Sequence, residues 1–375
     1  MKLIYILPTL SSGGAELRAI ERLNFLALHS NVQIELVVLS NIVPLLSEVN
    51  KSKNLNVSVL GLKHAEVFSK SALSSSWRNS RKLKRFLDET NADVVVASLP
   101  ISHFLVRLAY LNKKKKPRIW MYHHATQYLE NPVDNFQKKL LHNLNSYLCK
   151  KVDNGHIFIS KAVSDDLSAN LPIVNGKILY NAVPDKYADV MNLQVTMDKS
   201  NFNIVIPGRL TPVKGHIPAL RSLADFLKKE SSVKVWIAGD GSERTNIKAF
   251  AEENNLQNNI VLLGELEHAL LLRYIFDSDL VLIPSLAEGL GNVAIEALMM
   301  ASVTLVSDVG GLPEVINNPT LGTVVDISNS AAIVAAIEQI FYKRKIFEKE
   351  TIRRSYVERF TMQQHVSSFL NIINS

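Results

Sequence analysis

The chain has 375 residues, of which 47% are hydrophobic, and this composition can bury two domain cores and excludes an intrinsically disordered protein. The single cysteine, Cys149, excludes a disulfide framework and indicates a reducing compartment. No apolar run reaches the ~18 to 20 residues that a membrane-spanning helix requires, so we expect a soluble or peripheral protein of the cytoplasm.

The net charge of +7 is unevenly distributed. Residues 1–190 hold 25 lysines and arginines against 15 acidic residues, whereas residues 191–375 hold 17 against 20. Clustered cations attract either nucleic acid or an anionic membrane surface, although a solvated helix face is an equally good interpretation. The clusters are Arg78, Arg81, Lys82, Lys84 and Arg85, then Lys113 to Lys116, then Lys138 with Lys139, and Lys150 with Lys151.

The first predicted strand leads into a glycine turn. Residues 3–8 form an apolar run that is too short for a signal peptide, and the segment 9–16 joins it to a helix predicted over 17–28. Gly13 and Gly14 in this turn would let a phosphate approach the amides of a helix N-terminus. The spacing is not the dinucleotide fingerprint, and a plain tight turn is the alternative.

Two histidines follow a later strand of an alternating pattern. Strand-like runs at 34–39, 57–60, 93–98 and 118–122 are separated by segments long enough for helices, which predicts a parallel sheet. His123 and His124 then stand at the carboxyl edge, where such sheets bind ligands. Because side chains alternate along a strand, we expect one of the two in a cleft and favour His123, leaving His124 open.

A polar segment without periodicity, residues 185–200, predicts a hinge before the α/β pattern restarts at 203–207. Arg209 and Lys214 lie in the loop after this restart. Guanidinium can hold two oxygens of a diphosphate while ammonium acts as a mobile point charge. The alternative is a pair of solvated cations. Gly239 belongs to a glycine-rich loop after the next predicted strand.

The run 284–300 joins an apolar strand to a helix through a polar turn. Gly289 and Gly291 allow close backbone approach to a ligand, and the helix N-terminus favours a phosphate. Asn292 suits the N-cap position of this helix.

Two carboxylates of the same run are not needed for capping. Glu296 lies four residues after Asn292, one beyond the position of a capping box. A carboxylate near bound phosphate is stable when it accepts hydrogen bonds from hydroxyls, which favours a ribose or sugar diol for Glu296 and for Glu288. An ordinary turn with two solvated glutamates is the alternative.

Glu288 and Glu296, with seven residues between them, resemble the paired-glutamate signature of the retaining family 4 glycosyltransferases, or glycosyl transferases group 1. The resemblance covers nearly the whole chain and is closest over 203–316. It implies the α/β GT-B fold, with two Rossmann-like domains facing each other across a cleft. It implies an acceptor-binding domain over 1–190, a nucleotide-sugar-binding domain over 201–345, and a C-terminal helix over 346–375 that crosses back to the first domain.

The resemblance also implies a role for each candidate site residue. His123 and Glu288 would orient the transferred sugar, and Arg209 with Lys214 would neutralise the departing nucleoside diphosphate. The donor-binding residues would be Gly13, Gly14, Gly239, Gly289, Leu290, Gly291, Asn292 and Glu296. Because the two cations can stabilise the diphosphate, we expect no metal and no cofactor besides the donor sugar nucleotide.

We therefore expect a hexosyltransferase-type enzyme that moves a sugar from a nucleoside-diphosphate sugar to a hydroxyl acceptor. The basic first half fits a lipid-linked glycan at an anionic membrane surface, as in the assembly of surface polysaccharide, lipopolysaccharide or glycolipid. The alternatives are a nucleotide-sugar epimerase on the same fold and a non-catalytic basic binding protein. Nucleic acid is not an expected partner, because the basic clusters lack interleaved aromatic residues and a known binding module.

Overall fold

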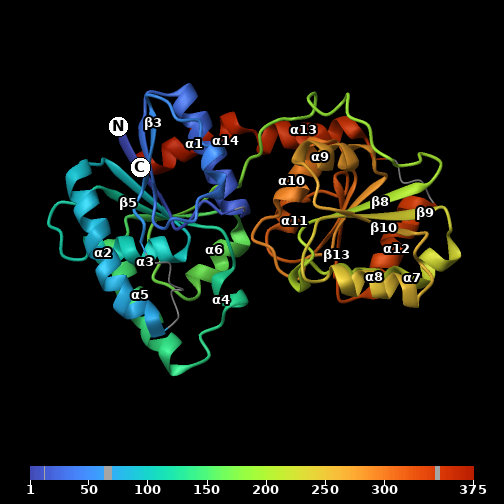
Figure 1. Ribbon diagram of the computed structural model, residues 1–375, viewed down its shortest axis with the longest axis horizontal. Coiled ribbons are helices and arrows are strands. Elements are labelled where there is room, and N and C mark those ends of the chain that lie inside the picture. The colour runs from blue at the N-terminus through green and yellow to red at the C-terminus, as the bar shows by residue number, and fades with distance from the viewer. Residues whose placement is uncertain (12, 63–69, 343–346) are drawn as a thin grey trace. The chain divides into compact units, whose positions relative to one another are not determined.

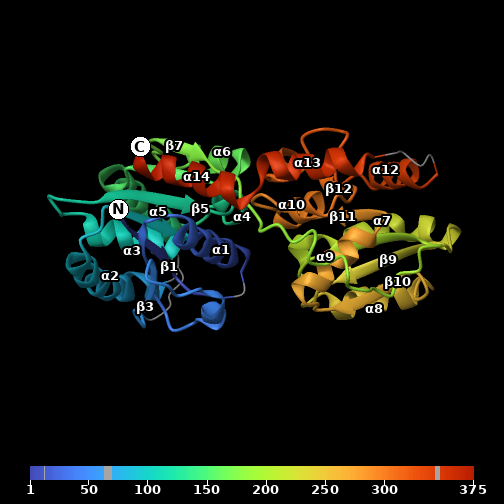
Figure 2. The ribbon, with the colours of Figure 1, turned by 90° about the horizontal axis from the view of Figure 1, so that it is seen from above.

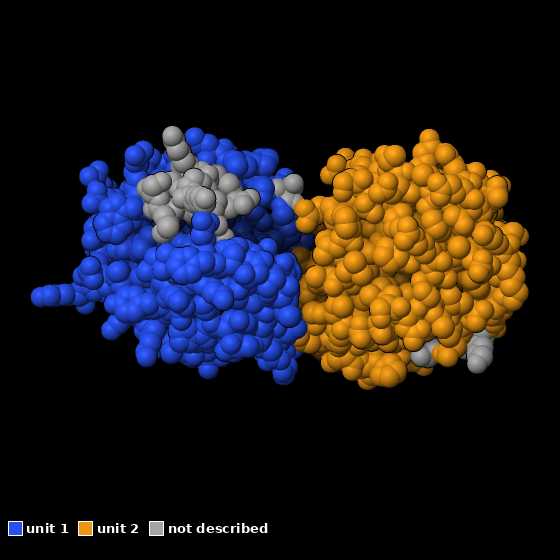
Figure 3. Space-filling view, turned by 90° about the horizontal axis from the view of Figure 1, so that it is seen from below, with its two compact units in different colours: residues 1–182, 362–375 blue, residues 183–361 orange. Residues whose placement is uncertain are grey.

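The structure, a computed structural model, describes residues 1–11, 13–62, 70–342 and 347–375. The chain divides into two compact units, residues 1–182 with 362–375 and residues 183–361 (Figure 3). Each unit holds one parallel sheet with helices packed on it, so the predicted α/β class with two Rossmann-like domains is confirmed. The predicted cleft stays a prediction.

The sheet of the first unit has seven strands in the order β3-β2-β1-β4-β5-β6-β7, and neighbouring strands are parallel (Figure 1). The strand order reverses between β1 and β4, which makes this position the topological switch point. The strands are β1 (Lys2–Leu7), β2 (Gln33–Val38), β3 (Leu55–Val59), β4 (Val94–Ser98), β5 (Arg118–His123), β6 (Gly155–Phe158) and β7 (Gly176–Ile178).

Helices of the first unit come from both ends of the chain. They are α1 (Gly14–His29), the short 3-10 helix η1 (Pro44–Glu48), α2 (Lys70–Thr90), α3 (Pro100–Tyr110), α4 (Gln127–Glu130), α5 (Phe136–Val152), α6 (Lys161–Ser168) and α14 (Met362–Asn374). The last helix packs beside α1, where Nε of Arg22 donates to Nε2 of His365 over 2.7 Å (Figure 1). This buried hydrogen bond ties the C-terminal helix to the first unit.

The second unit has a six-stranded parallel sheet in the order β10-β9-β8-β11-β12-β13, with its switch point between β8 and β11. Its strands are β8 (Phe202–Pro207), β9 (Val233–Ala238), β10 (Ile260–Gly264), β11 (Leu280–Ile283), β12 (Thr304–Ser307) and β13 (Gly322–Val325). Its helices are η2 (Pro212–Lys214), α7 (His216–Lys229), α8 (Arg244–Glu253), α9 (His268–Asp277), α10 (Asn292–Met299), α11 (Leu312–Val315), α12 (Ser330–Phe341) and α13 (Lys349–Arg359). Helices α7 and α12 pack side by side (Figure 2).

The strands are buried because parallel strands are covered on both faces and therefore consist of continuous apolar runs. In the first unit, Leu3, Ile4, Tyr5, Ile6 and Leu7 of β1 are fully buried. In the second unit, the core contains Ile204 and Ile206 of β8 together with β9, β11 and the inner faces of α7 and α12. These two cores hold the carboxyl edges of the sheets, and the loops on those edges, in fixed positions.

The C-terminal segment differs from the predicted single helix over 346–375. It forms α13 in the second unit and α14 in the first, because the backbone leaves the helical region at Phe360, where φ is −129°. Residues 343–346, which include the start of that prediction, lie outside the described residues, as does Ser12 in the first glycine turn.

The segment 185–200, predicted as a hinge, has no helix or strand and is fixed to the second unit. Nη1 of Arg273 donates to the carbonyl of Met191 over 2.7 Å, and the hydroxyls of Thr196 and Tyr274 lie 3.0 Å apart. A hinge function for this segment stays a prediction.

Candidate functional site

Two loops at the switch point of the second unit bring the predicted cations and glutamates together. One follows β8 and carries Arg209 and Lys214, and the other follows β11 and carries Glu288. Because β8 and β11 are neighbours in the sheet, their following loops meet at the carboxyl edge, where open α/β sheets bind ligands. The fold thus places residues that are 74 positions apart in one site.

Lys214 and Glu288 form an ion pair between these loops. Nζ of Lys214 donates to Oε2 of Glu288 over 2.6 Å, and Oγ of Ser285 donates to the same oxygen over 3.2 Å. Both partners are partly buried, which shields the pair from full solvent screening. Gly215 makes the close approach possible, because its φ is +69° and a Cβ there would lie 1.9 Å from the carbonyl oxygen of Pro284.

Arg209 stands at the open side of the same loop. Its side chain is exposed, and its guanidinium makes no hydrogen bond or ion pair within the described parts of the chain. The preceding Gly208 has φ +142°, and a Cβ there would meet no described atom within 4 Å. A backbone that requires glycine but faces open space can accept a ligand at close range. Arg209 and Gly208 therefore leave room for an anion beside Lys214.

Gly239 supports this loop through close packing. It has φ +147°, and a Cβ at this position would lie 2.0 Å from the carbonyl oxygen of Gly208. The turn after β9 thus packs directly against the turn after β8. Its predicted contact with the donor stays a prediction, but the packing already explains why glycine stands there.

The helix after the second loop begins one residue earlier than predicted. The N-cap of α10 is Gly291, with φ +95°, and Asn292 is the first helical residue, so the prediction of Asn292 as N-cap was wrong. A Cβ at Gly291 would lie 2.4 Å from Cδ2 of Leu312, which explains the preference for glycine. Leu290 is buried, while Gly289 is partly buried. The predicted contacts of both residues with the donor stay predictions.

Glu296 lies inside α10 and is buried, although its neighbours on that helix are apolar. Nε2 of His268, at the start of α9, donates to Oε1 of Glu296 over 3.1 Å. His268 is only partly buried and brings the carboxylate a polar contact that reaches solvent. His268 was not among the predicted site residues, because a lone histidine 28 residues before its partner carries no motif.

The sequence contains an Asp-x-Asp spacing, Asp277 with Asp279, although no such metal-binding pair was expected. Asp277 accepts from Nε of Arg273 over 2.6 Å, and Asp279 accepts from the backbone amide of Asn203 over 2.7 Å. Asp279 directly precedes β11, so it lies at the amino edge of the sheet and away from the loops just described. Both carboxylates thus have structural partners.

In the first unit, Gly13 and Gly14 stand at the switch point, as the N-cap and first residue of α1. Oε1 of Glu16 accepts from the hydroxyls of Thr9 and Ser11 over 3.0 Å and 2.7 Å. A Cβ at Gly13 would lie 2.3 Å from Oε2 of Glu16. The glycine therefore makes room for a carboxylate that complements the helix N-terminus, where the sequence suggested open space for phosphate.

The turn after β4, on the other side of this switch point, is strained. Leu99 has φ +73° and ψ 150°, a region that side chains rarely adopt, just before α3 begins at Pro100. Strain of this kind costs about 1 to 3 kcal/mol and is concentrated at binding sites. Because β1 and β4 are parallel neighbours, this turn and the glycine turn after β1 lie at the same edge of the first sheet.

The two histidines at the end of β5 occupy different environments. His123 is buried among aromatic rings, with Nε2 3.1 Å from Nδ1 of His156. His124 is less buried, stacks on Tyr122, and has Nε2 2.8 Å from the hydroxyl of Ser98. Burial is the main cause that lowers both pKa values, that of His124 to about 3, so both rings are neutral at pH 7. Neither can serve as a charged acid there.

Potential metal ligands also gather in the first unit. Among the described residues, Cys149, Asp153 and His156 are all buried and place one ligand atom each within 4.8 Å of the others. The guanidinium of Arg107 occupies the same cluster, bound to Asp153. None of the described helices is long and apolar enough to cross a membrane.

The two halves of the chain match two described protein families. Residues 12–186 match Glycosyltransferase Family 4, and residues 194–356 match Glycosyl transferases group 1. The chain is 28% identical over 197 residues to an uncharacterized glycosyltransferase of Methanocaldococcus jannaschii, covering 49% of this chain and 50% of that protein. It is 26% identical over 179 residues to the phosphatidylinositol N-acetylglucosaminyltransferase GPI3 subunit of Saccharomyces cerevisiae, covering 48% of this chain and 39% of that protein.

The chain thus spans half or less of the length of these two curated relatives. Among solved structures, the fold is similar to that of HepE from Anabaena in complex with UDP and glucose. That match has a TM-score of 0.79, 17% identity and complete coverage of both chains, and at this identity it supports the fold alone.

Proposed function

Because this chain belongs to the family of glycosyl transferases group 1, or glycosyltransferase family 4, we propose that it transfers a sugar from a nucleoside-diphosphate sugar to a hydroxyl acceptor with retention of configuration. The observation that carries the proposal is the ion pair of Lys214 with Glu288 beside the exposed Arg209. It lies at the switch point of the second sheet, where a doubly wound fold binds nucleotides.

The two cations supply electrostatic stabilisation. When the glycosidic bond breaks, the diphosphate gains negative charge, so Arg209 and Lys214 act more strongly on the transition state than on the ground state. Arg209 can grip two phosphate oxygens in a fork, while the ammonium of Lys214 has three donors and Glu288 uses one of them. We propose that this charge makes the reaction independent of a metal ion.

The two glutamates hold hydroxyls in this proposal. Glu296 accepts hydrogen bonds from the ribose diol, and its bond from His268 fixes the direction of the carboxylate. Glu288, positioned by Lys214 and Ser285, accepts from a hydroxyl of the transferred sugar. The acceptor attacks on the face from which the diphosphate leaves, and a phosphate oxygen takes the acceptor proton. His123 orients the sugar as a neutral ring.

We propose an anionic membrane surface as the partner of the first unit and a lipid-linked glycan as the acceptor. Exposed apolar residues occur in α4 and in the first turns of α5: Leu129 is 76% exposed in α4, and Phe136 and Leu140 are 79% and 57% exposed in α5. Lys138 and Lys139 follow in the same turn. Exposed apolar side chains flanked by lysines suit the boundary between headgroups and acyl chains.

The test of the proposed activity is a donor panel. The melting temperature of the purified chain is measured with UDP-, GDP- and ADP-sugars in the presence of EDTA. In separate samples, nucleoside diphosphate release is followed with and without a membrane lipid extract. We expect one donor to raise the melting temperature and to release its diphosphate only when lipid is present. An epimerase would change the donor sugar without lipid. Absence of binding and release across the panel would contradict the proposal.

The membrane partner has a separate test. We expect the chain to float with vesicles that contain anionic lipid at low salt, and a Phe136→Ser, Leu140→Ser variant to float less. The control Val357→Ser removes an apolar side chain that is 46% exposed in the second unit and should leave flotation unchanged. Equal flotation of the double variant and the unchanged chain would show that these two side chains do not insert.

A further inference from the structure

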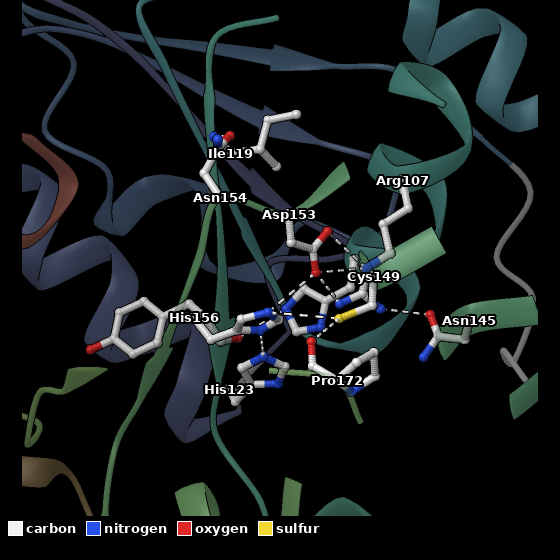
Figure 4. Close-up of polar contacts among 11 residues, drawn as sticks. Arg107, Ile119, His123, Asn145, Cys149, Asp153, Asn154, His156 and Pro172 are labelled. Atoms are coloured by element: carbon white, nitrogen blue, oxygen red, sulfur yellow. Dashed lines mark hydrogen bonds and ion pairs between the residues drawn. The ribbon is translucent and has the colours of Figure 1, made fainter. Parts of the chain in front are cut away.

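A chain of buried polar groups lies beneath the end of β5 in the first unit (Figure 4). His123 ends β5, and its side chain is only 4% exposed. Its ring packs on His103 of α3, His156 of β6 and Phe158, with ring centres 4.6 Å, 5.4 Å and 5.2 Å away. Three rings therefore fix the plane of His123.

Polar contacts continue from His123 into the core. Its Nε2 lies 3.1 Å from Nδ1 of His156, and Nε2 of His156 lies 3.5 Å from Oδ2 of Asp153. The same nitrogen of His156 is 3.7 Å from Sγ of Cys149 (Figure 4). In the hydrogen bond between the two rings, one nitrogen must donate and the other must accept. The groups around Nε2 of His156 therefore determine which nitrogen of His123 carries the proton.

The inner end is an ion pair of Arg107 with Asp153. Nε of Arg107 donates to both carboxylate oxygens over 3.0 Å, and Nη1 donates to Oδ1 of Asn145 over 2.6 Å. Burial raises the pKa of Asp153, but the guanidinium is always charged and directs its donors at both oxygens. We therefore assign the carboxylate form to Asp153.

A carboxylate at this place sets the tautomer of His156. Its Nε2 faces Oδ2 of this carboxylate and so carries the proton, because a lone pair there would be repelled. Burial, followed by the charge of Arg107, lowers the pKa of His156 to about 3, so the ring holds one proton. Its Nδ1 is then an acceptor, which requires His123 to donate through Nε2.

We propose that His156 is a positioning residue that holds His123 in the tautomer protonated at Nε2. This leaves Nδ1 of His123 as a lone pair, and this atom has no hydrogen-bond partner among the residues that the structure describes. His123 then accepts a hydrogen bond from a substrate hydroxyl and donates none. The part that concerns substrate rests on the proposed transferase function, whereas the tautomer is a property of the chain alone.

A metal ion is the competing explanation for this cluster, because Cys149, Asp153 and His156 are possible ligands. Arg107 disfavours it, since the guanidinium already neutralises Asp153 and a divalent cation would lie beside a second buried charge.

The test reads the tautomer of His123 by two-bond 1H–15N NMR on the full chain with 15N-histidine, assigned with a His123→Gln variant. We expect protonation at Nε2 in the unchanged chain. His156→Leu should convert His123 to a mixture or to the Nδ1-protonated form. His156→Asn should preserve the tautomer, because its amide oxygen can accept at the position of Nδ1. The matched control Cys149→Ala removes the neighbouring thiol and should leave His123 unchanged.

Activity and metal content supply the second measurements. If the transferase activity is present, His156→Leu should lower kcat roughly tenfold with the donor KM within about twofold, and His156→Asn should restore most of it. An Nδ1-protonated His123 in the unchanged chain, or an unaltered tautomer in His156→Leu, would overturn the proposal. Stoichiometric zinc that is lost in Cys149→Ala would overturn it in favour of a metal site. If His156→Leu does not fold, the unchanged chain and His156→Asn still decide the question.

Discussion

Nζ of Lys214 lies 2.6 Å from Oε2 of Glu288, and this ion pair joins the loop after β8 to the loop after β11. The pair spans the switch point of the second sheet, with the exposed Arg209 on the same loop as Lys214. A bound diphosphate would compete with Glu288 for the ammonium group. The pair therefore holds the cation in place before the donor arrives.

Removing the charge of Lys214 should damage the reaction more than the fold. We expect Lys214→Gln to lower kcat/KM by roughly 10² to 10³, because a directed cation at the departing diphosphate is lost. Steady-state kinetics with the donor identified by the panel measures this. Lys248→Gln on α8, whose only described ion pair is a loose one of 3.9 Å to Glu252, is the matched control. Equal values of kcat/KM for the two variants would show that Lys214 does not take part in the reaction.

Glu296 and His268 should act on donor affinity as a pair. We expect Glu296→Gln to weaken nucleoside-diphosphate binding about tenfold, and His268→Gln to weaken it less, because the carboxylate remains but loses a fixed direction. Calorimetric titration with the nucleoside diphosphate measures both changes. Unchanged affinity and full activity of Glu296→Gln would refute its assignment to the ribose.

Two glycines of the same site should respond differently to alanine. At Gly239 a Cβ would lie 2.0 Å from a backbone oxygen, so Gly239→Ala should lower the free energy of unfolding by more than about 2 kcal/mol. At Gly208 a Cβ has space, so Gly208→Ala carries only the cost of φ +142° but obstructs the ligand. We expect Gly208→Ala to remain the more stable variant and to lose donor affinity. Denaturant unfolding and titration together decide this, and a destabilisation at Gly208 equal to that at Gly239 would contradict it.

The buried histidines predict acid sensitivity. Burial is the main cause that lowers the pKa of His156 to about 3 and of His216 to about 4, against roughly 6.5 in the unfolded chain. The unfolded chain thus binds more protons, so stability is complete above pH 6.5 and falls as the pH drops toward 4. Each such histidine contributes up to about 1.4 kcal/mol per pH unit in this window.

Urea unfolding at pH 7.5 and pH 5.0 measures this dependence. We expect a lower free energy of unfolding at pH 5.0, and a smaller difference between the two pH values in His156→Asn. The exposed His29 is the control, since His29→Gln should leave the difference unchanged. A free energy of unfolding that is the same at both pH values would contradict this prediction, because the folded and unfolded chains would then bind equal numbers of protons.

The sequence predicts the alternating α/β order, the two glycine turns and the loops with cations, because these depend on local patterns. It does not predict that Lys214 pairs with Glu288 or that His268 supports Glu296, because these contacts depend on which strands are neighbours in the sheet. The strand order also explains the buried environment of His123, since His156 comes from the adjacent strand β6.

Local geometry accounts for the other differences. Asn292 and Gly291 are both acceptable N-caps by residue type, and in the structure Gly291 takes this position with φ +95°, a conformation that glycine adopts without strain. The break between α13 and α14 occurs at Phe360, a residue without any helix-breaking signal in the sequence. The start of α10 and the break between α13 and α14 therefore depend on the three-dimensional structure and not on the sequence pattern alone.

The most direct test of the proposed retaining transfer is the anomeric configuration of the product. The chain would be incubated with its donor, lipid acceptor and EDTA, and the anomeric proton of the transferred sugar followed by NMR from the first turnover. We expect a new glycosidic bond with the configuration of the donor and one nucleoside diphosphate released per bond. An inverted product, or a donor converted to its epimer with no transfer, would contradict it.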